Sequence, residues 1–455
     1  MIFVSLRWGK QMKILLVRPK PQNLFAKLKT VRFEPLELEY LAAVANELNF
    51  NYRIYDGLLE RQPFSSFLKD NQPDVVAITG YTIHVNLIKE YAEIVKEYGT
   101  NIKVVVGGIH AELNWRDFYD FNIDIIIHAN PLQAFRDVLL NLQNQGCWQP
   151  VKNICFKKDN EWIKNQGESL VPNTLPLPDR THLHLYKDKF RYFGKEQCAL
   201  VKTAWGCPYS CNFCYCACLN GGEYSTRDIT KVVREISDLE QEKIFIIDDD
   251  FLVDKNRLLE FCRLISVYNI KKDFSIYGRA DLICAHQDIL SKLKASGISE
   301  IIVGLEAVDD ETLNNYNKKT STHSNLQAIE LLRKNGIKSC GLFIVNEDYG
   351  LEDFKRLSAI VKKMALDLCM FSIFTPLKGV PGYEKYQERL IIPENKYENN
   401  DFLHLNIKPT KLSVTRFYLE FYKLYLLAYS DVRRLRSNIR PIIKSILNLI
   451  IGGIR

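Results

Sequence analysis

Residues 198–214 read CALVKTAWGCPYSCNFC, an apolar run that leads into three closely spaced cysteines. Cys207, Cys211 and Cys214 stand at C-x3-C-x2-C spacing. A strand that runs into Gly-Cys-Pro must turn, because the glycine relaxes φ and the proline fixes it. We therefore expect all three thiols on one loop at the C-terminal end of a strand, where they can converge on one point. Three thiolates favour an iron–sulfur cluster with one iron left open, since a structural zinc ion takes four protein ligands.

This cysteine pattern, with the aromatic Phe213 just before its last member, resembles the signature of radical SAM enzymes. The resemblance implies that Cys207, Cys211 and Cys214 hold a 4Fe–4S cluster and that S-adenosylmethionine (SAM) chelates the open iron. Electron transfer then cleaves SAM to methionine and a 5′-deoxyadenosyl radical. The ring of Phe213 is expected against the adenine face; the alternative is local packing.

Two further cysteines, Cys216 and Cys218, follow shortly after the pattern. They could form a zinc-like set with Cys214, but the family spacing assigns the cluster to the first three cysteines. We expect Cys216 and Cys218 to be bystanders or to line the pocket. The alternative is that one of them takes part in chemistry.

Length and composition describe a large globular chain. Its 455 residues, 47% of them hydrophobic, suffice for two or three domains. The 12 cysteines do not indicate a disulfide framework, because five of them crowd into residues 207–218; they fit a reducing cytoplasm. Residues 2–4 are too short an apolar run for a signal peptide, and no stretch reaches the ~18 apolar residues of a membrane-spanning helix. Met12 resembles a natural start, which would make residues 1–11 an upstream extension.

The net charge of +7, from 61 basic and 54 acidic residues, is concentrated at the C-terminus. Residues 432–455 contain six basic residues and no acidic one, so the rest of the chain is nearly neutral. A nucleic-acid-binding surface over the whole protein is therefore not expected. Within this tail, the apolar run 441–451 is too short to span a bilayer but could lie on an anionic membrane. The alternative is a helix packed on the protein.

Apolar runs alternate with amphipathic segments from residue 12 to residue 145. Strands are expected at 13–17, 52–56, 74–80, 103–108 and 124–128, and helices at 35–48, 64–69, 86–98 and 132–142. This alternation predicts a doubly wound, Rossmann-like parallel sheet. Ligands bind such sheets at the C-terminal ends of the strands. The candidate loops are therefore 18–22, 81–86 and 107–111.

This half resembles the cobalamin-binding domain that is fused to many radical SAM proteins. Residues 107–111, Gly-Gly-Ile-His-Ala, are similar to a loop of that subfamily, and residues 33–38 match the start of its first helix. Paired glycines let the backbone approach a bulky ligand. The cobalamin contacts that the resemblance implies are Thr79, Tyr81, Thr82, Gly107, Gly108 and His110.

One feature departs from the wider cobalamin-binding fold. Many such domains carry Asp-x-His-x-x-Gly after the first strand, with the histidine below the cobalt, whereas residues 17–21 contain no histidine. The lower cobalt face would then lack a histidine ligand. The alternative is an empty scaffold without cobalamin. His110 would contact the corrin or be a simple loop histidine, and we expect His84 to be structural.

Four prolines between residues 150 and 178 predict a linker over residues 146–192, with a small hairpin at 153–163. The alternation then resumes over 193–376. Strands are expected at 198–204, 243–247, 274–279, 300–305, 339–345 and 368–375, and helices at 230–239, 255–268, 285–296, 324–335 and 351–364. Six strand–helix units are too few for a closed barrel, so we predict a partial (β/α)6 barrel. A small, mainly helical region is expected over 377–455, with helix 415–429 as a cap on the barrel mouth.

Polar residues end several of these strands, where catalytic groups of such barrels lie. By family position, Asp249 or Asp250 would receive the ammonium group of SAM; the alternative is a solvated turn or a capping aspartate. Arg279 would hold the SAM carboxylate or form a salt bridge to the acidic loop. Glu306 would accept from the ribose or amine of SAM, or be a buried structural carboxylate. Arg227, in a segment that resembles the family's Ser-x-Arg, would steady the site or be a surface charge.

Together these resemblances predict a cobalamin-dependent radical SAM enzyme that methylates an unactivated carbon of a small-molecule, lipid or peptide substrate. The implied mechanism uses two SAM molecules, one to methylate cobalamin and one to give the radical that removes hydrogen. The alternatives are cyclisation or rearrangement without methyl transfer, and a non-catalytic cobalamin- or redox-responsive protein. The expected partners are the substrate and an electron donor such as flavodoxin or ferredoxin. We expect a cytoplasmic location, with peripheral membrane contact through the basic tail as a further option.

Overall fold

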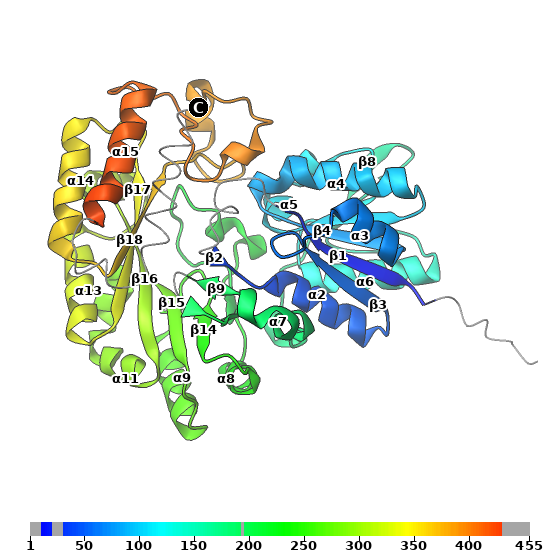
Figure 1. Ribbon diagram of the computed structural model, residues 1–455, viewed down its shortest axis with the longest axis horizontal. Helices are drawn as coiled ribbons and strands as arrows, with labels where there is room; N and C mark the ends of the chain where they lie inside the picture. The colour runs from blue at the N-terminus through cyan, green and yellow to red at the C-terminus, as the bar shows by residue number, and fades with distance from the viewer. Residues whose placement is uncertain (1–10, 21–30, 193–194, 430–455) are drawn as a thin grey trace, which may run out of the picture. The chain divides into compact units, whose positions relative to one another are not determined.

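The structure is a computed structural model, and it describes residues 11–20, 31–192 and 195–429 (Figure 1). The chain divides into two compact units. The first contains residues up to 21, 35–170 and 175–182; the second contains 22–34, 171–174 and the residues from 183 onward. Most of the expected upstream extension and the whole basic tail lie outside the described residues. Within the described ranges, no helix is long and apolar enough to cross a membrane.

The first unit is built on a seven-stranded sheet in the order β3-β1-β4-β5-β6-β7-β8. Its strands are β1 (Lys13–Arg18), β3 (Asn51–Asp56), β4 (Val75–Thr79), β5 (Lys103–Gly107), β6 (Ile125–Ile127), β7 (Ile154–Lys158) and β8 (Glu161–Lys164). The first five strands run parallel, and β7 and β8 pair antiparallel at one edge. Leu15, Val76 and Val105 in the central strands are at most 1% exposed, as expected for parallel strands covered on both faces.

Helices cover both faces of this sheet, as a doubly wound fold requires. They are α2 (Leu36–Glu47), α3 (Phe64–Asn71), α4 (Val85–Tyr98), α5 (Ile109–Asn114) and α6 (Pro131–Asn144). α2 packs with α6, and α3 packs with α4. Right-handed crossovers place these two pairs on opposite faces of the sheet, and Figure 1 shows them there. The predicted Rossmann-like architecture is confirmed.

The order of the strands reverses at β1: the chain goes first to β3 on one side, then returns past β1 to β4. In doubly wound sheets a ligand crevice opens at this switch point, beyond the C-terminal ends of the strands. Arg18 and Thr79 end the two strands that flank it, and Gly107 ends the next strand. The loops selected from the sequence therefore follow strands at the ligand-binding edge.

Two short segments pair differently from what the sequence suggested. The hairpin expected in a linker extends the first sheet instead, because Ile127 pairs with Ile154. The short strand β2 (Val31–Arg32), close before α2, pairs with β9 (Arg191–Tyr192) in the second unit. Both pairings join residues far apart in the sequence, so local pattern did not predict them.

The second unit contains a six-stranded, all-parallel sheet in the order β11-β14-β15-β16-β17-β18. Its strands are β11 (Cys198–Val201), β14 (Lys243–Ile246), β15 (Asp273–Arg279), β16 (Ile298–Glu306), β17 (Lys338–Val345) and β18 (Leu368–Ile373). The outer strands, β11 and β18, do not pair with each other. The predicted open, partial (β/α)6 architecture is confirmed.

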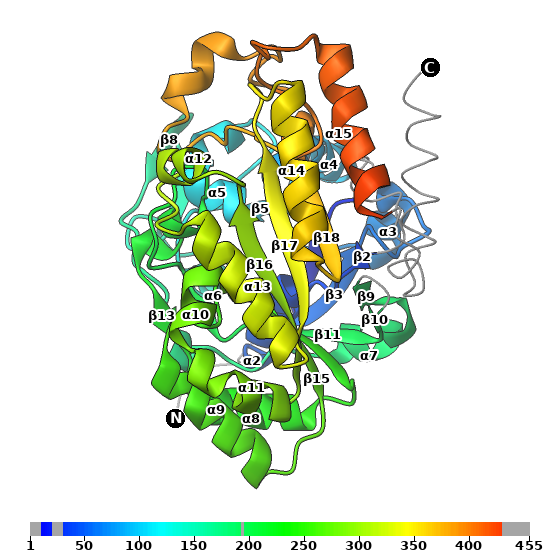
Figure 2. The same ribbon diagram turned by 90° about the vertical axis from the view of Figure 1, so that its left-hand side faces the viewer.

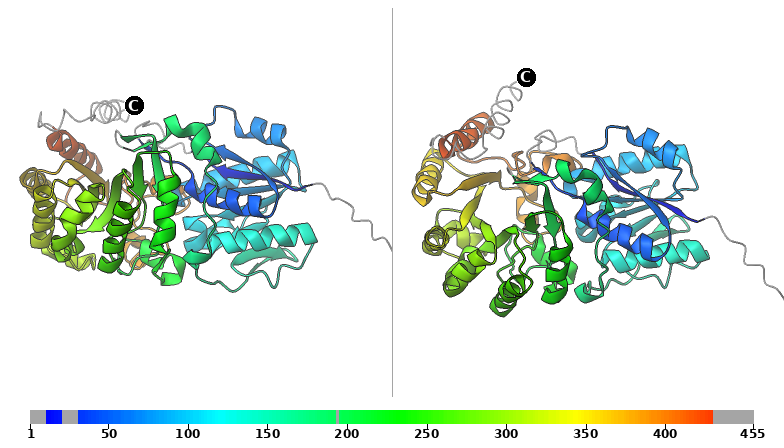
Figure 3. Two further views of the ribbon diagram at one scale, coloured as in Figure 1. Left: turned by 90° about the horizontal axis from the view of Figure 1, so that it is seen from below. Right: turned by 60° about the horizontal axis from the view of Figure 1, so that its bottom comes forward.

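The helices of this unit lie along one face of the sheet, as Figures 2 and 3 show. They include α8 (Ile229–Asp238), α9 (Lys255–Val267), α11 (Leu290–Ala295), α13 (Thr322–Lys334) and α14 (Leu351–Met364). Polar side chains cap the first turns of α8, α9 and α13; Asp254, for example, accepts from the backbone nitrogens of Asn256 and Arg257 at 2.9 and 3.1 Å. The expected helix 285–296 is wrong in its first half, because α10 (Ala280–Ala285) ends there and α11 begins only at Leu290.

The last described helix, α15 (Val414–Ala428), runs along the edge strand β18. The hydroxyl of Tyr425 accepts from the backbone nitrogen of Phe371 at 3.1 Å and donates to its carbonyl oxygen at 2.6 Å. Tyr429 makes the same pair of bonds with Cys369. These hydroxyls occupy backbone groups that an edge strand would otherwise leave open. The expectation that this helix caps the barrel mouth is therefore wrong.

Candidate active site

The cysteine loop, residues 206–214, follows β11 and the short strand β12 (Ala204–Trp205), which pairs with β13 (Ser225–Thr226). Gly206 has a φ of +75°, and a Cβ atom there would lie 2.2 Å from the carbonyl oxygen of Glu223. No side chain fits in that space, and the left-handed backbone disfavours any other residue. The turn expected from Gly-Cys-Pro is present at the end of the strand.

Asp248 fixes the approach to this loop. Its carboxylate accepts from the backbone nitrogens of Thr203 and Ala204 at 2.6 and 3.0 Å, and from the hydroxyl of Thr203. The side chain is buried, so the carboxylate and its donors satisfy one another without water. Asp248, the first of three successive aspartates, therefore stabilises the backbone that leads into the cysteine loop.

The segment 315–318, which follows α12 (Asp310–Asn315), holds the far side of the loop. The backbone nitrogen of Asn212 donates to the carbonyl oxygen of Tyr316 at 3.0 Å, and the side chain of Asn317 donates to the carbonyl oxygen of Ser210 at 2.7 Å. The ring of Phe213 meets that of Tyr316 edge to face, with 5.2 Å between centroids. Contacts on both sides therefore fix the backbone that carries the thiols.

The three thiols differ in their surroundings. Burial raises the pKa of Cys207 to about 12. Burial also raises the pKa of Cys211, against the opposing charges of Lys318 and Arg279. The pKa of Cys214 is lowered, chiefly because the thiol of Cys216 donates a hydrogen bond to it.

Within the described residues, no three His, Cys, Asp or Glu side chains are gathered as a metal site. The three sulfur atoms therefore lie on one loop but do not converge on one point in this structure. The donor set still fits a thiolate-held iron–sulfur cluster, because it offers three sulfur atoms, with the Arg279 guanidinium 3.8 Å from that of Cys211. A closed zinc set with Cys216 and Cys218 does not form either.

Asp250 is the aspartate with a free oxygen. It is 3% exposed, and its Oδ1 accepts from the backbone nitrogen of Leu252 at 2.8 Å. Its Oδ2 is buried and has no hydrogen-bond partner, and burial raises the pKa of this carboxyl to about 7. A buried, unpaired carboxyl oxygen is costly, so this group suits a ligand that brings a donor or a positive charge. Asp249 beside it is half-buried.

Arg279, the last residue of β15, reaches the cysteine loop. Its Nη1 donates to the sulfur of Cys211 at 3.8 Å, and its guanidinium lies 3.8 Å over the ring of Tyr209. Its salt bridge is to Asp281, with Nε 3.0 Å from Oδ1, rather than to the acidic loop at 248–250. The group is therefore already paired, and a ligand carboxylate would compete with or join Asp281.

Glu306, the last residue of β16, forms a buried ion pair with Lys318 at 2.7 Å. Glu306 has a φ of +60°, a conformation that non-glycine residues adopt at a cost and that is common at functional sites. The sequence predicted Glu306 but not Lys318, which lies in a turn without a recognisable motif. Arg227, by contrast, is 5% exposed and pairs with Glu235 of α8 at 2.6 Å; it is a buried structural cation, not a surface charge.

Phe213 lines a narrow pocket beside the cysteine loop, with a volume of only about 10 Å³, which is room for about one water molecule. Its walls include Asn212, Phe213, Phe374, Leu377, Tyr383 and Tyr386. The segment after β18 thus faces the loop across an apolar, aromatic space. No charged side chain lines it, and the ring of Phe213 packs against Tyr316 and Phe374, so in this structure the ring makes local packing contacts.

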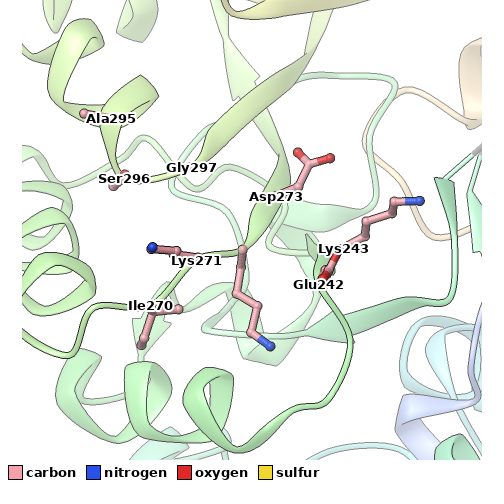
Figure 4. A pocket seen from close by; sticks show the side chains of 9 residues that line it. Glu242, Lys243, Ile270, Lys271, Asp273, Ala295, Ser296 and Gly297 are labelled. Atoms are coloured by element: carbon pink, nitrogen blue, oxygen red, sulfur yellow. The ribbon is translucent and has the colours of Figure 1, made fainter.

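A wider pocket, shown in Figure 4, lies at the opposite end of the same sheet. Lys243 and Asp273, which begin β14 and β15, line it together with Gly297, just before β16. Functional groups of parallel α/β sheets gather at the C-terminal ends of the strands. We therefore do not regard this pocket as part of the site.

In the first unit, the predicted ligand loops lie at the C-terminal edge of the sheet. Thr79 pairs with Gly107 in the register of β4 and β5. Gly108 has a φ of +102°, and a Cβ atom there would lie 2.7 Å from the carbonyl oxygen of Gly80. This glycine lets two loops touch through their backbones. Tyr81 is 51% exposed and offers a flat ring at this edge.

His110 is fully buried in the loop that follows β5. Its Nδ1 lies 3.0 Å from the hydroxyl of Thr82, and its Nε2 lies 3.0 Å from the carboxylate of Asp117. Both ring nitrogens are engaged, which favours the alternative of a loop histidine over a corrin contact. His84 is also buried and accepts from the backbone nitrogen of Tyr81 at 3.1 Å; burial lowers its pKa to about 4.

Two protein-family models match the chain in the order of these units. The B12 binding domain matches residues 30–138, and the Radical SAM superfamily matches residues 201–361. The second match contains the cysteine loop, Asp250, Arg279, Glu306 and Lys318.

Characterised and uncharacterised relatives match over most of the chain. A hopanoid C-3 methylase of Methylococcus capsulatus is 24% identical over 92% of this chain and 80% of its own length. An uncharacterized methyltransferase of Pyrococcus horikoshii is 25% identical, over 82% of this chain and 83% of its own. An anaerobic magnesium-protoporphyrin IX monomethyl ester cyclase of Cereibacter sphaeroides is 24% identical, over 88% and 68%.

Solved structures share the fold. The radical S-adenosylmethionine methyltransferase TsrM from Kitasatospora setae, with cobalamin and a [4Fe-4S] cluster bound, matches with a TM-score of 0.74 and 14% identity, over 92% of this chain and 91% of TsrM. The cobalamin-dependent S-adenosylmethionine radical enzyme OxsB matches with a TM-score of 0.67 and 16% identity, over 83% of this chain and 55% of OxsB.

Proposed function

Because the chain belongs to the radical SAM enzymes that carry a B12-binding domain, we propose that it methylates an unactivated carbon of a small-molecule, lipid or peptide substrate. Its cofactors are a 4Fe–4S cluster, SAM and cobalamin. The observation that carries the proposal is the cysteine loop at a strand end, with the unpaired Asp250 oxygen and the Arg279 guanidinium on the same rim. Relatives named as methylases support the choice of methyl transfer.

Cys207, Cys211 and Cys214 would hold the cluster. When bound, the cluster and SAM supply a carbon-centred radical, and cobalamin supplies the methyl group. The chain's own contribution is to orient and shield the reactants. Gly206, Asp248 and the segment 315–318 fix the loop, and burial of Cys211 keeps water from its sulfur.

The free oxygen of Asp250 would accept the ammonium group of SAM, and Arg279 would attract its carboxylate. An ammonium group next to Asp250 satisfies the orphan oxygen and favours the carboxylate over the protonated acid. The flat ring of Phe213 would pack against adenine, and the small pocket beside it would have to widen to admit that ring. These roles follow from position and charge, and each can be tested by substitution.

Cobalamin would bind at the C-terminal edge of the first unit's sheet. Gly108 lets the loops after β4 and β5 lie in close contact at this edge, and Thr79, Tyr81, Thr82 and Gly107 on these loops would contact the cofactor. His110 would act by holding the Thr82 loop to the loop after β5. Residues 17–21 contain no histidine, so this segment would offer the cofactor no imidazole.

The second candidate function is a cyclisation or rearrangement on the same cofactors. It is favoured by the similarity to the anaerobic magnesium-protoporphyrin IX monomethyl ester cyclases, one of which is 24% identical over 88% of this chain. A third alternative is a non-catalytic role as a cobalamin- or redox-responsive protein, which would form no 5′-deoxyadenosine. An electron donor such as flavodoxin or ferredoxin belongs to both catalytic proposals.

The test is anaerobic reconstitution of the full chain with iron, sulfide, cobalamin and labelled SAM, with a reduced flavodoxin or ferredoxin as the electron donor. We expect 5′-deoxyadenosine and S-adenosylhomocysteine, with both products lost in Cys207→Ala. Cys147→Ala is the matched control, because Cys147 is exposed and lies in the first unit. If Cys207→Ala forms deoxyadenosine as the wild type does, the radical proposal fails. Deoxyadenosine without S-adenosylhomocysteine, in the presence of a turned-over substrate, favours the cyclisation alternative.

A further inference from the structure

We propose that the outward face of α15 docks on the surface of an anionic lipid membrane. The sequence suggested such contact only for the basic tail at 432–455, and the structure adds a folded helix that comes shortly before this tail in the chain. The helix has a defined start, because the side chain of Ser413 accepts from the backbone nitrogen of Arg416 at 3.3 Å. The inference does not depend on the reaction that the chain catalyses.

One face of α15 is fixed in the protein. Phe417, Phe421 and Leu424 are at most 2% exposed, and the helix packs on α14 and β18, as Figure 2 shows. The hydroxyl of Tyr425 adds two hydrogen bonds to the backbone of β18. These contacts set the position of the helix and, with it, the direction of the opposite face.

The opposite face of α15 carries exposed leucines. Leu419, Leu426 and Leu427 are 58%, 46% and 48% exposed. Side chains seven or eight residues apart lie on the same face of a helix, so these three form one apolar strip. A single exposed leucine is ordinary on a protein surface, whereas a group on one helix face is typical of an interaction site.

Two cations share this face with the leucines. The side chains of Arg416 and Lys423 are 51% and 58% exposed, and both pair with Glu420, at 2.7 and 3.5 Å. The side chain of Glu420 is only 10% exposed, so the face shows solvent its cations rather than their anion. Long basic side chains lay their apolar stems along a surface and keep their charged ends in water. Leucines flanked by such cations are typical of helices that lie at a membrane surface.

Charge selects the occupant of this face. A second copy of α15 would bring Arg416 and Lys423 close to the same two cations. The tail at 432–455 has six basic residues and no acidic one, so it would also meet them with like charge if it folded back. Like charges across an interface oppose association. An anionic lipid surface instead attracts the helix and the tail together, and its apolar layer takes up the leucines.

The test measures co-sedimentation of the full chain with vesicles made of equal parts of phosphatidylcholine and phosphatidylglycerol, or of phosphatidylcholine alone. We expect binding to the anionic vesicles that weakens as the salt concentration rises. Leu419→Gln/Leu426→Gln should weaken this binding about tenfold or more, because two leucine side chains no longer enter the lipid. Leu185→Gln/Val267→Gln is the matched control, since these side chains are 73% and 63% exposed on other helices, and it should bind as the wild type does.

A second variant tests the charge. Lys423→Gln leaves the pair of Arg416 and Glu420 in place, and we expect it to weaken binding to the anionic vesicles about fivefold. Lys334→Gln is its control, because Lys334 is also exposed and pairs with a glutamate of its own helix, Glu330, at 2.9 Å. Urea midpoints show whether each variant folds as the wild type does, and if the leucine variant does not, the result for Lys423→Gln decides.

Four outcomes overturn the inference. The wild-type chain fails to bind the anionic vesicles, or it binds phosphatidylcholine vesicles equally well. A folded leucine variant binds as the wild type does, which would assign the contact to the tail alone, or Lys423→Gln binds as Lys334→Gln does. A dimer in analytical ultracentrifugation that the leucine variant disrupts, without vesicle binding, would assign the face to a second copy of the chain.

Discussion

The carboxylate of Asp248 accepts a hydrogen bond from the backbone nitrogen of Thr203 at 2.6 Å, at the point where β11 gives way to the cysteine loop. The same carboxylate takes the backbone nitrogen of Ala204 at 3.0 Å. Asp248, Asp249 and Asp250 follow one another in the sequence, and three neighbouring carboxylates repel unless a hydrogen-bond donor or a cation meets one of them. The structure assigns that role to Asp248 and leaves Asp250 with a free oxygen. One triplet thus contains a structural carboxylate and a candidate ligand-binding carboxylate.

Asp248→Ala should destabilise the second unit by about 3 kcal/mol, because two backbone donors and one hydroxyl lose their buried acceptor. Asp248→Asn is the matched control. Its amide oxygen still accepts from the backbone, and its amide nitrogen can donate to the Thr203 hydroxyl, so we expect a loss of less than about 1 kcal/mol. Urea unfolding midpoints of the cofactor-free protein measure the difference. Equal midpoints for the alanine and asparagine variants would contradict the clamp.

Gly206→Ala should unfold the turn into the cysteine loop. The added Cβ would meet the Glu223 carbonyl oxygen at 2.2 Å, and the left-handed φ alone costs about 1–2 kcal/mol for a non-glycine residue. Gly222 offers a control, because its φ is +82° but a Cβ there would meet only the Ala217 carbonyl oxygen at 3.6 Å. We expect iron content after reconstitution to fall strongly in Gly206→Ala and to remain near wild type in Gly222→Ala. The same iron content in both would show that the close contact does not matter.

The fold was predictable from the sequence because the strands and helices of the two sheets have clear local sequence patterns. Their buried strands are continuous apolar runs, and the periodic helix 351–364 matches α14 residue for residue. The errors occur where tertiary partners decide. The residues of the β7–β8 hairpin do not indicate which sheet the hairpin joins. α15 packs on β18 through the hydroxyls of Tyr425 and Tyr429, and the hydrophobic periodicity of the helix does not predict these hydrogen bonds.

The candidate site was predictable in the same uneven way. The cysteines, Asp250, Arg279 and Glu306 lie at strand ends or in a spaced motif, so pattern and position selected them. Lys318 lies in a turn whose importance depends on two left-handed residues and on a partner 12 positions earlier. His110 and Arg227 were selected from the sequence as site residues because of their residue type and position. In the structure each contacts a buried carboxylate, Asp117 and Glu235 respectively, so both make structural contacts within the protein.

Cys216→Ala should leave the cluster in place, because the proposed ligands are Cys207, Cys211 and Cys214. The thiol of Cys216 donates to Cys214 in the cofactor-free chain, a bond that a metal-bound sulfur would no longer need. We expect iron content within about 20% of wild type for Cys216→Ala and for Cys218→Ala, and little iron for Cys214→Ala, as three-thiolate ligation requires. Loss of iron in Cys216→Ala would instead assign this residue to the metal site.

The stability of the cofactor-free protein should fall as the pH rises from about 4 to 7. Burial raises the pKa of Asp250 from 3.8 to about 7, so in this window the folded chain keeps a proton that the unfolded chain has released. The contribution is therefore fully present below pH 4 and lost as the pH passes 7, at about 1.4 kcal/mol for each pKa unit as an upper bound. Glu347, whose pKa burial also raises to about 7, acts in the same direction. Asp250→Asn and Glu347→Gln should each flatten the profile of urea midpoints between pH 5 and 8; an unchanged slope in Asp250→Asn would refute the buried proton.

The same proton gives a signature of SAM binding in the reconstituted protein. If the ammonium group of SAM lies against Asp250, it favours the carboxylate, so binding near pH 7 should release a proton from this residue. Titration calorimetry in two buffers with different ionisation enthalpies measures that release. We expect Asp250→Asn to abolish it and to weaken SAM binding about tenfold or more, the loss of a charge-assisted hydrogen bond, whereas Glu347→Gln should keep both the release and the affinity. Proton release that persists in Asp250→Asn would place the ammonium group elsewhere on the rim, with Asp249 as the next carboxylate to test.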